Sequence, residues 1–470
     1  MIENSLVYGF LSRIGIWCLN LMKNSALGRF FLSPNENVAE TRGSVFYKLY
    51  YFLRKLCEKV FFALRLNILF ANSVFKMVFL WTAAAAVIAP IAPTMAVIAL
   101  AVAGFGSLFL YLMCNPKEEL RYFPLNKYIY AFAGVYLIAI FISTDVKGSL
   151  YGGMVTVLFI MFYMVVINAV KTKKQFRGLL FFMVCAGVLV SLYGFYQYMN
   201  QGKFGGVWVD TDMFGSISFR VYSTLGNPNV LGEYFLLIIP TTVACFIVSK
   251  KYIFKAFYFC AAAVMMLCLF ITYSRGCYIG MIMAAGVFLV LLDRRFIILG
   301  IFGLMLLPFI LPDTIINRFM SIGNMNDSST SYRVYIYLGT ISMLKDYWLS
   351  GIGPGQSAFN KVYPYYGYNG IGAPHSHNTF LQVTCDAGIA GIVVFIACIY
   401  QFYKLLFRKF MDTKNKTEKI FVIAFMSSLS GFFVQSMTDY TFYNYRVMAL
   451  FWIYVGLGAL STIYSELKEE

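Results

Sequence analysis

The sequence predicts an all-α integral membrane protein with about twelve transmembrane helices and a large, partly helical loop on the extracytoplasmic side. Hydrophobic residues make up 60% of the 470 residues and charged residues 13%, whereas a soluble domain carries roughly a quarter charged residues. The apolar residues come in long blocks separated by short polar clusters, which is typical of membrane spans. No stretch has the composition of a soluble domain, so one membrane domain with one sizeable loop is expected.

Residues 1–74 are predicted to form a cytoplasmic N-terminal extension. No cleavable signal is expected, because no clean apolar region with a small-residue cleavage site follows Met1. Apolar side chains recur at helical spacing over residues 44–66, with lysines such as Lys48 and Lys55 on the other side. This pattern predicts an interfacial amphipathic helix on the inner membrane surface. A helix that docks a protein partner is the alternative.

The membrane domain is expected over residues 75–465, followed by a short cytoplasmic tail over 466–470. Pro90 and Pro93 separate the first two apolar runs and predict a tight hairpin. The twelve runs of spanning length are 75–91, 93–114, 126–143, 150–169, 178–199, 230–248, 254–272, 277–292, 295–311, 387–403, 419–437 and 447–465.

Lysine and arginine residues predict the orientation of these spans. With both termini in the cytoplasm, 29 of the 38 basic residues fall in cytoplasmic segments and only nine in extracytoplasmic loops. Such a bias over many short loops favours this multi-pass topology. It also accounts for the net charge of +17, so nucleic acid is not an expected partner.

Two predicted extracytoplasmic segments, 200–229 and 312–386, are too long to be simple connectors. Loops of such length usually contain structure of their own and are often functional. A helix is expected over residues 331–346, with Ser331 as its cap, and the glycines of 351–355 predict a turn. Several tyrosines follow over 363–368; their rings suit sugar faces and a lipid interface equally well.

The candidate site combines histidines and arginines on this predicted outer side. His375 and His377 are the only two histidines of the chain, and a histidine accepts protons near neutral pH. Arg220 lies in the loop 200–229, Arg275 in the tight outer turn between the seventh and eighth spans, and Arg333 on the expected helix of the loop 312–386. Because arginine binds phosphate oxygens with two donors, the set favours an anionic, phosphorylated ligand. The alternatives are a structural role for the histidines and contacts of the arginines with lipid headgroups.

Other chemistries find little support in the sequence. No nucleotide-binding P-loop motif occurs, and the scattered cysteines suggest neither a disulfide framework nor a zinc site. Asp210 and Asp212 have the spacing to bind a divalent ion, but a solvated loop is favoured there. The spans contain almost no acidic residues apart from Glu233, whereas an ion-coupled transporter usually carries carboxylates inside the membrane.

Four short motifs, in this order, resemble those of the O-antigen ligase and polymerase superfamily. They are G-N-P-N at 226–229, T-x-S-R-G at 272–276, G-x-G-P-G at 351–355, and H-N at 377–378 followed by G-x-x-G at 388–391. The resemblance covers about residues 200–400. The large extracytoplasmic loop of that family lies between the ninth and tenth spans, as it does in this sequence. Each motif is weakly specific by itself, but the ordered set in a twelve-span frame is more specific.

The resemblance implies a membrane-embedded, GT-C-like glycosyltransferase fold in the bacterial cytoplasmic (inner) membrane. It implies transfer of a glycan from undecaprenyl diphosphate to an acceptor hydroxyl on a glycan, lipid or protein, with inversion and without cofactor or metal. His377 is then the expected general base, and Arg220, Arg275 and Arg333 the expected diphosphate ligands. Supporting roles are expected for Asn227, Asn229, His375 and Asn378.

Three alternatives remain open at the level of sequence. A polymerase joins one lipid-linked repeat to another, whereas a ligase moves the finished chain to a different acceptor, and the sequence does not separate them. A transporter or flippase of lipid-linked oligosaccharides is the alternative from another class; the one-sided polar residues and the lack of a convincing internal repeat argue against it. The histidine motif argues against a cell-wall polymerase of the shape and division type.

Overall fold

The computed structural model describes residues 45–66, 74–205, 219–293, 295–310, 312–321, 323–324 and 327–469. These residues form helices joined by turns, without a β-strand; a single isolated bridge pairs Thr172 with Lys468. The all-α prediction is confirmed. Residues 1–44 of the predicted extension, and the Asp210–Asp212 pattern, lie outside the described residues.

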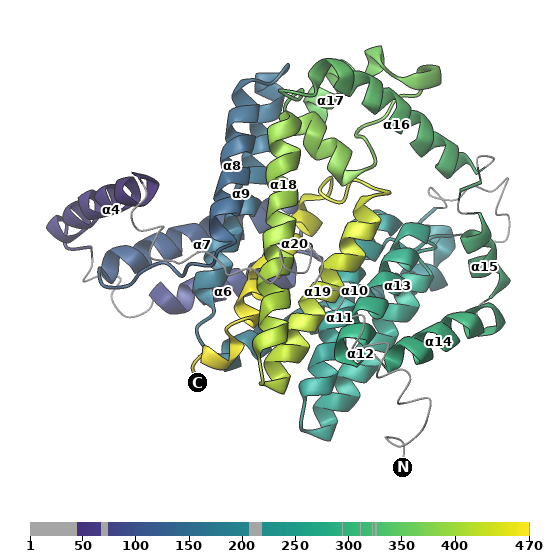
Figure 1. Cartoon of the computed structure of the whole chain (residues 1–470), viewed down its shortest axis with the longest axis horizontal. Helices are drawn as coiled ribbons and strands as arrows, with labels where there is room; N and C mark the ends of the chain where they lie inside the picture. The colour runs from purple at the N-terminus through teal and green to yellow at the C-terminus, as the bar shows by residue number, and fades with distance from the viewer. Residues whose placement is uncertain are drawn as a thin grey trace.

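Each predicted span coincides with a helix (Figure 1). The helices are α6 (Val74–Ile88), α7 (Thr94–Cys114), α8 (Asn126–Phe141), α9 (Val146–Ala169), α10 (Lys173–Met199), α11 (Pro228–Val248), α12 (Tyr252–Phe270), α13 (Arg275–Leu292), α14 (Phe296–Ile310), α18 (Thr379–Asp412), α19 (Lys416–Ser436) and α20 (Tyr445–Ser461). Among the described residues, eight helices are long and apolar enough to cross a membrane, and α6, α8 and α20 are shorter apolar helices. The count of twelve spans therefore stays a prediction.

Polar side chains fix where these apolar helices begin. Asp145 accepts a hydrogen bond from the backbone N–H of Gly148 and so caps α9, while Thr172 and Gln175 form a reciprocal capping box at the start of α10. Asn415 caps α19, since its side chain accepts from the backbone N–H groups of Thr417 and Glu418. Because the first N–H groups of a helix have no partner inside it, such caps stabilise the turns between spans.

The core of the bundle is formed around α11 and α20. α11 packs against α12, α13, α19 and α20, and most of its residues are buried inside the protein. α20 is buried along most of its length, with Trp452 and Tyr454 among the most deeply buried side chains. These helices are surrounded by other helices, so their ends provide a rigid frame for the loops that they carry.

The long segment before α18 has structure of its own, as the sequence predicted. It contains α15 (Asp313–Met320), α16 (Ser328–Tyr347) and α17 (Gln356–Val362). A separate small hydrophobic core joins α16 and α17 to neighbouring residues, namely Ile336, Met343, Ile352, Ala358, Phe359, Val362, Tyr363 and Cys385. One detail of the prediction was wrong: the helix expected over 331–346 begins at Ser328, and Asp327 caps it in place of Ser331.

Glycines allow this segment to pack closely on α18. This helix begins at Thr379, eight residues before the span predicted over 387–403. α18 is interrupted at Ala387 and Gly388, where Gly388 has a φ of 61°. Gly351 has a φ of 71° and lies against the same interruption, so a side chain at either glycine would collide with backbone atoms. Such left-handed conformations favour glycine.

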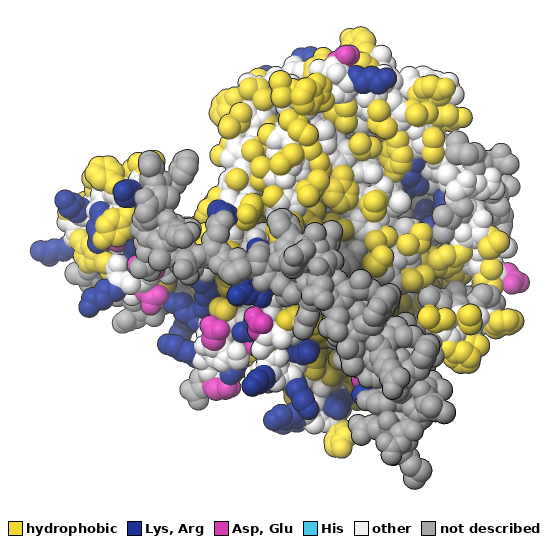
Figure 2. Space-filling model, viewed as in Figure 1, with side chains coloured by type: hydrophobic (Ala, Val, Ile, Leu, Met, Phe, Trp, Pro, Cys, Tyr) yellow, Lys and Arg dark blue, Asp and Glu magenta, His cyan; other side chains and the backbone are white. Residues whose placement is uncertain are grey.

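The two ends of the bundle differ in their contacts. At one end, the α6–α7 turn receives hydrogen bonds from Thr224 (Oγ1 to Pro90 O, 2.6 Å) and Arg446 (Nη1 to Ala92 O, 3.3 Å). At the other end, Lys173 pairs with Glu469 at 2.6 Å. Figure 2 shows basic side chains gathered at this lower end, below a largely hydrophobic surface. Loops predicted on the same side of the membrane thus lie at the same end, and the orientation itself stays a prediction.

The amphipathic helix of the N-terminal extension is α4 (Val45–Ala63), which lies beside the far end of α7 (Figure 1). Its buried stripe consists of Arg54, Glu58 and Phe61. Arg54 pairs with Glu58 at 2.8 Å and donates to carbonyl groups at the end of α7, including that of Asn115. These bonds satisfy carbonyls that the helix end leaves without partners.

The remaining surface of α4 divides into two faces. Exposed apolar side chains on one face are Leu49, Phe52, Leu53, Leu56 and Val60, each 49 to 64% exposed. Lys48, Lys55 and Lys59 lie on a second face. One stripe against the protein, one apolar face and one basic face fit a helix at a membrane surface, so the geometry is consistent with the interfacial location that the sequence predicts.

The helix interruption at Gly388 provides a test of this packing. We expect Gly388→Ala to lower the melting temperature of the purified protein by several degrees, because the new methyl group meets the carbonyl of Leu349 and the backbone is left-handed. The matched control is Gly286→Ala in α13, where the added Cβ has no neighbour within 4 Å. Equal melting temperatures for the two variants, measured by thermal unfolding in detergent, would contradict the packing described.

Candidate active site

Arg220 lies on a short extended segment held against the turn between α12 and α13. Val221 donates its backbone N–H to Ile271 O at 3.1 Å, and its buried side chain anchors the segment in the core. The Arg220 side chain then donates from Nε to Thr272 O at 2.9 Å and from Nη2 to Asn229 Oδ1 at 3.1 Å. These two hydrogen bonds fix the direction of its guanidinium.

Arg275 is the first residue of α13 and forms a two-point ion pair. Its Nη1 and Nη2 donate to the two carboxylate oxygens of Asp327 at 2.9 and 2.8 Å. Nη1 also donates to the hydroxyl and carbonyl oxygens of Ser321. The side chains of Arg275 and Asp327 are only 10% and 1% exposed. The pair is therefore largely shielded from water and joins α13 to the start of α16, which Asp327 caps.

Arg333 lies one turn inside α16 and bridges to the α19–α20 turn. Nε donates to Thr438 O at 2.9 Å, and Nη1 donates to the carbonyl and hydroxyl oxygens of Ser329. Nη2 has its nearest acidic neighbour at 3.9 Å, in Asp439 Oδ2, which is too far for a hydrogen bond. Within the described residues, Nη2 therefore makes no hydrogen bond.

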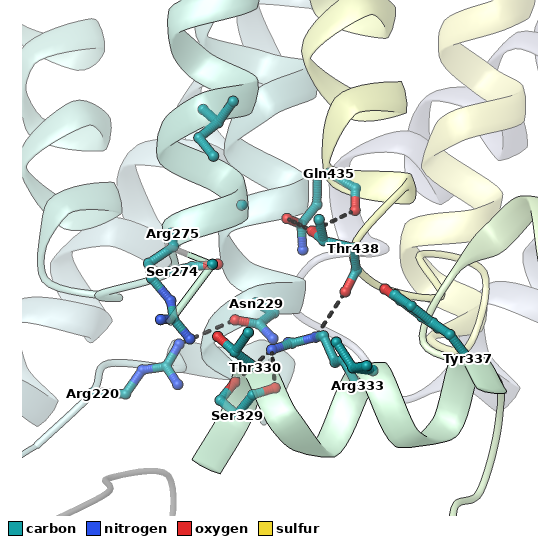
Figure 3. Close-up of a pocket in the computed structure, with 14 residues that line it drawn as sticks. Arg220, Asn229, Ser274, Arg275, Ser329, Thr330, Arg333, Tyr337, Gln435 and Thr438 are labelled. Atoms are coloured by element: carbon teal, nitrogen blue, oxygen red, sulfur yellow. Dashed lines mark hydrogen bonds between the residues drawn. The ribbon is translucent and has the colours of Figure 1, made fainter. Parts of the chain in front are cut away.

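The three arginines come from three separate outer segments of the predicted topology. They line one pocket of about 210 Å³, named here the arginine pocket (Figure 3). Asn229, Ser274, Thr330, Gln435 and Thr438 supply further polar groups to its wall. Gly276 leaves room for Gln435 and Thr438, because a Cβ there would collide with both. Pockets for drug-sized ligands are roughly 300–1,000 Å³, so this one fits a compact charged group.

The G-N-P-N motif builds one wall of the arginine pocket. Gly226 has a φ of 78°, Asn227 caps α11 by accepting from the N–H of Asn229 at 2.8 Å, and Pro228 occupies the first turn. Asn229 then accepts from Arg220 and donates from Nδ2 to Asp439 Oδ2 at 2.9 Å. Asn227 is thus a structural cap, whereas Asn229 connects the pocket to Asp439.

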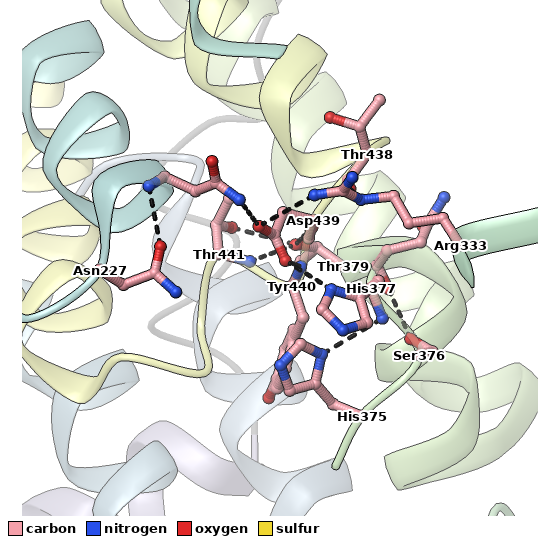
Figure 4. Close-up of polar contacts among 12 residues, drawn as sticks. Asn227, Arg333, His375, Ser376, His377, Thr379, Thr438, Asp439, Tyr440 and Thr441 are labelled. Atoms are coloured by element: carbon pink, nitrogen blue, oxygen red, sulfur yellow. Dashed lines mark hydrogen bonds and ion pairs between the residues drawn. The ribbon is translucent and has the colours of Figure 1, made fainter. Parts of the chain in front are cut away.

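His377 and Asp439 form a hydrogen-bonded pair, named here the His–Asp pair, at the edge of the pocket (Figure 4). His377 Nδ1 lies 3.1 Å from Asp439 Oδ1. Burial alone would raise the pKa of Asp439, but the hydrogen bond from His377, together with the charge of Arg333, holds this pKa well below its usual range. A carboxylate at Nδ1 requires the proton on that nitrogen, which leaves a lone pair on Nε2. The geometry is that of a general base and its orienting carboxylate.

The backbone of His377 is held in an uncommon conformation with a φ of 49°. Its N–H donates to His375 Nδ1 at 3.2 Å, and its carbonyl oxygen accepts from the Tyr337 hydroxyl at 3.0 Å. Burial, followed by the nearby His377, lowers the pKa of His375 to about 3, so this ring stays neutral and can accept that bond. Asn378 caps α18 and donates to Met437 O at 2.9 Å. His375 and Asn378 therefore hold the backbone around His377 in place.

His375, His377 and Asp439 offer three ligand atoms within 4.8 Å of one another, so a metal ion has to be considered. His375 Nδ1 and His377 Nδ1 already take part in hydrogen bonds, and Asp439 accepts from Asn229. The positive charge of Arg333 lies 3.9 Å from the same carboxylate. The residues fit a hydrogen-bonded His–Asp pair better than a cation site.

Two acidic residues of this site were missed in the sequence. Asp439 is the only acidic residue between α19 and α20, a position that signals a partner for a basic group on the same side. Asp327 precedes Ser328 and Ser329 at the start of an apolar periodic run, which is a helix-start signal. Neither pattern reveals the partner, because the pairing with His377 or Arg275 depends on how distant segments fold together.

Residues 260–396 match the family model described as O-antigen ligase. The match supports the resemblance to the O-antigen ligase and polymerase superfamily, and together with the apolar helices it indicates a glycosyltransferase-like, multi-pass membrane enzyme of polysaccharide biosynthesis. The matched segment contains Arg275, Arg333 and His377, whereas Arg220 and Asp439 lie outside it. No curated protein matches the chain.

Removing the partner of Arg275 tests the ion pair that closes the pocket wall. We expect Asp327→Asn to lower the free energy of unfolding by about 3–5 kcal/mol, because it leaves the Arg275 charge buried and unpaired. The control is Asp293→Asn, whose pair with Arg295 is largely exposed and contributes about 1 kcal/mol or less. Equal stabilities of the two variants in denaturant unfolding would show that the Arg275 pair is not a structural element.

Proposed function

From the match of residues 260–396 to the O-antigen ligase family, we propose that the protein transfers a glycan from undecaprenyl diphosphate to an acceptor hydroxyl at the outer face of the cytoplasmic membrane. The observation that carries this proposal is the convergence of Arg220, Arg275 and Arg333 on one pocket beside the His–Asp pair. A pocket with three guanidinium groups suits a diphosphate, and a neighbouring histidine with a free lone pair suits an acceptor hydroxyl.

In the proposed reaction, the acceptor hydroxyl oxygen attacks the anomeric carbon of the lipid-linked glycan. The bond between that carbon and the diphosphate oxygen breaks, and its electron pair stays with the undecaprenyl diphosphate. His377 Nε2 takes the proton of the acceptor hydroxyl, and Asp439 stabilises the imidazolium that forms. A single displacement of this kind inverts the anomeric centre and requires neither metal nor nucleotide.

The three arginines are proposed to act differently on the diphosphate. Arg333 and Arg220 both line the pocket, Nη2 of Arg333 makes no hydrogen bond among the described residues, and bonds to Thr272 and Asn229 orient Arg220. Both are proposed to stabilise the negative charge of the leaving group. Arg275 already has both terminal nitrogens on Asp327. Its contribution is therefore mainly to hold the pocket wall, with long-range attraction for an anion partly offset by Asp327.

A transfer assay tests the proposed function directly. Purified protein in lipid is supplied with an undecaprenyl-diphosphate-linked oligosaccharide and candidate acceptors, and the size and attachment of the product are measured. Longer chains on the carrier would identify a polymerase, and glycan on a second molecule would identify a ligase. Movement of the lipid-linked sugar across the bilayer without transfer would instead establish the flippase alternative.

We expect His377→Ala to abolish transfer while leaving the folded yield largely intact, because the base is lost from the edge of the pocket. A loss of about 10²–10⁴-fold in kcat is the usual effect of removing a general base. Asp439→Asn should show a smaller loss, because the orienting carboxylate is removed and the base remains. Full activity of His377→Ala would refute the assignment of the base.

Arg333→Lys should lose most activity although the positive charge is kept. An ammonium group cannot hold Ser329 and Thr438 together and still direct a second nitrogen at the diphosphate. The control is Arg408→Lys, since Arg408 pairs with Asp412 at the far end of α18. A nearly unchanged kcat/KM for Arg333→Lys would indicate that Arg333 contacts lipid headgroups rather than the substrate.

A further inference from the structure

The carboxyl group of Asp386 is buried in the first part of α18 and takes no part in the proposed reaction. Its residue is only 1% exposed. Oδ1 accepts a hydrogen bond from Gln382 Nε2 at 2.9 Å, and Oδ2 accepts from the hydroxyl of Tyr136 in α8 at 3.2 Å. Both donors are neutral groups. Burying a carboxyl group is costly, and an apolar side chain would avoid that cost. The group therefore has a role beyond filling space in the core.

Gln382 connects this carboxyl group to the chain segment that carries the histidines. Gln382 is buried, and its Oε1 accepts from the backbone N–H of Ser376 at 2.8 Å. A side-chain amide has one donor side and one acceptor side. Because Asp386 takes the donor side, the acceptor side has to face Ser376. A buried series of hydrogen bonds thus leads from α8 through Asp386 and Gln382 to the residue before His377.

Helical spacing places these groups on one face of α18, directly before its interruption. Asn378, Gln382 and Asp386 follow one another at intervals of four residues, so their side chains lie on the same face. The interruption at Gly388 ends this regular stretch. The first two turns of α18 therefore form a short polar stretch with Asp386 at one end and the histidine segment at the other.

The segment over residues 375–377 depends on such contacts because its backbone is strained. His377 has a φ of 49°, in a region that side chains other than glycine rarely adopt. Ser376 is completely buried, and its hydroxyl donates to Asn378 O at 2.9 Å. With its N–H held by Gln382 as well, Ser376 fixes the backbone from which the ring of His377 projects toward Asp439 (Figure 4).

We propose that Asp386 is a positioning residue for His377. Through Gln382 and Ser376 it holds the ring of His377 where Nδ1 meets Asp439 and Nε2 keeps its lone pair for the acceptor. The effect on transfer rests on the proposed function, whereas the effect on the ring does not depend on it. Neither Asp386 nor Gln382 lines the arginine pocket, so a change at either residue acts on the base and leaves the donor site intact.

The tautomers of the two histidines provide a measurement that does not depend on transfer. His375 Nδ1 accepts a backbone hydrogen bond, so its neutral ring carries the proton on Nε2, whereas His377 carries its proton on Nδ1 next to Asp439. These are the only two histidines of the chain. ¹⁵N NMR of histidine-labelled protein in nanodiscs, with a histidine-free affinity tag, therefore shows one ring of each kind, and the Nδ1–H signal reports the position of His377.

We expect Asp386→Leu and Gln382→Met to remove the Nδ1–H signal, because the ring of His377 then leaves its carboxylate and takes up both tautomers. Asp386→Asn should retain the signal, since its amide oxygen still accepts from Gln382 and its amide nitrogen can donate to the hydroxyl of Tyr136. Gln382→Met keeps Asp386 on Tyr136 and tests the same link if the leucine variant does not fold.

Transfer kinetics with separately varied donor and acceptor should show the same division. A displaced base lowers the rate of the chemical step, so kcat of Asp386→Leu should fall about 10²-fold, with KM for the lipid-linked donor unchanged. Asp386→Asn should recover most of that loss. The matched control is Tyr163→Phe, which removes a different buried hydrogen bond, from Tyr163 to Asn126 at 2.8 Å, and should leave kcat and both histidine rings as in the wild type.

The NMR result decides the proposal separately from the proposed function. An Nδ1–H signal that stays in both Asp386→Leu and Gln382→Met, or that Tyr163→Phe removes as well, would overturn the proposal even if the wild type transfers glycan. A wild type without any Nδ1–H ring would also overturn it, since His377 would then have no such position to keep. Loss of the signal in the first two variants and its presence in Asp386→Asn supports the proposal even where no acceptor is glycosylated, in which case only the proposed function fails.

Discussion

The carboxylate of Asp439 is the contact on which the arrangement of the site depends. One of its oxygens faces His377, the other accepts from Asn229, and Arg333 lies nearby. Its backbone carbonyl accepts from the Thr379 hydroxyl. One residue thus connects the starts of α11, α16 and α18 with the α19–α20 turn. A carboxylate largely withdrawn from water is costly unless such partners surround it, so these segments have to meet in one arrangement for the charge to be stabilised.

The sequence predicted the helical architecture well because each span carries its own signal. Continuous apolar runs between basic clusters marked α9, α11 and α19 with small errors, since a bilayer imposes length and composition on each helix independently. The errors arose where tertiary packing decided the outcome. α18 begins at Thr379 rather than near residue 387, because Asn378 caps the polar first turns and Gly388 allows the helix axis to change direction. No local hydrophobic pattern contains that information.

The candidate site was predictable as a set of side chains but not as a network. Arg220, Arg275 and Arg333 were identified as basic residues of the predicted outer segments, Arg275 also within a motif, and the structure brings them to one pocket. Several motif residues turn out to serve the backbone instead: Gly226 and Asn227 start α11, Gly276 leaves space for Gln435, and Asn378 starts α18. The partners Asp327 and Asp439 were not predicted, because each is a single acidic residue whose role depends on a basic residue far away in the sequence.

The pairing of Arg275 with Asp327 has a consequence for turnover. The arginine pocket carries three guanidinium groups, yet Asp327 and Asp439 supply two compensating carboxylates at its border. In the proposed reaction, a pocket without these carboxylates would hold the diphosphate more tightly and slow the departure of the spent carrier. With much of the positive charge already balanced, the attraction is strongest while charge develops on the leaving oxygen and weaker once the product is solvated. Under the proposed function, the same internal ion pair that stiffens the wall would thus favour recycling of the lipid carrier.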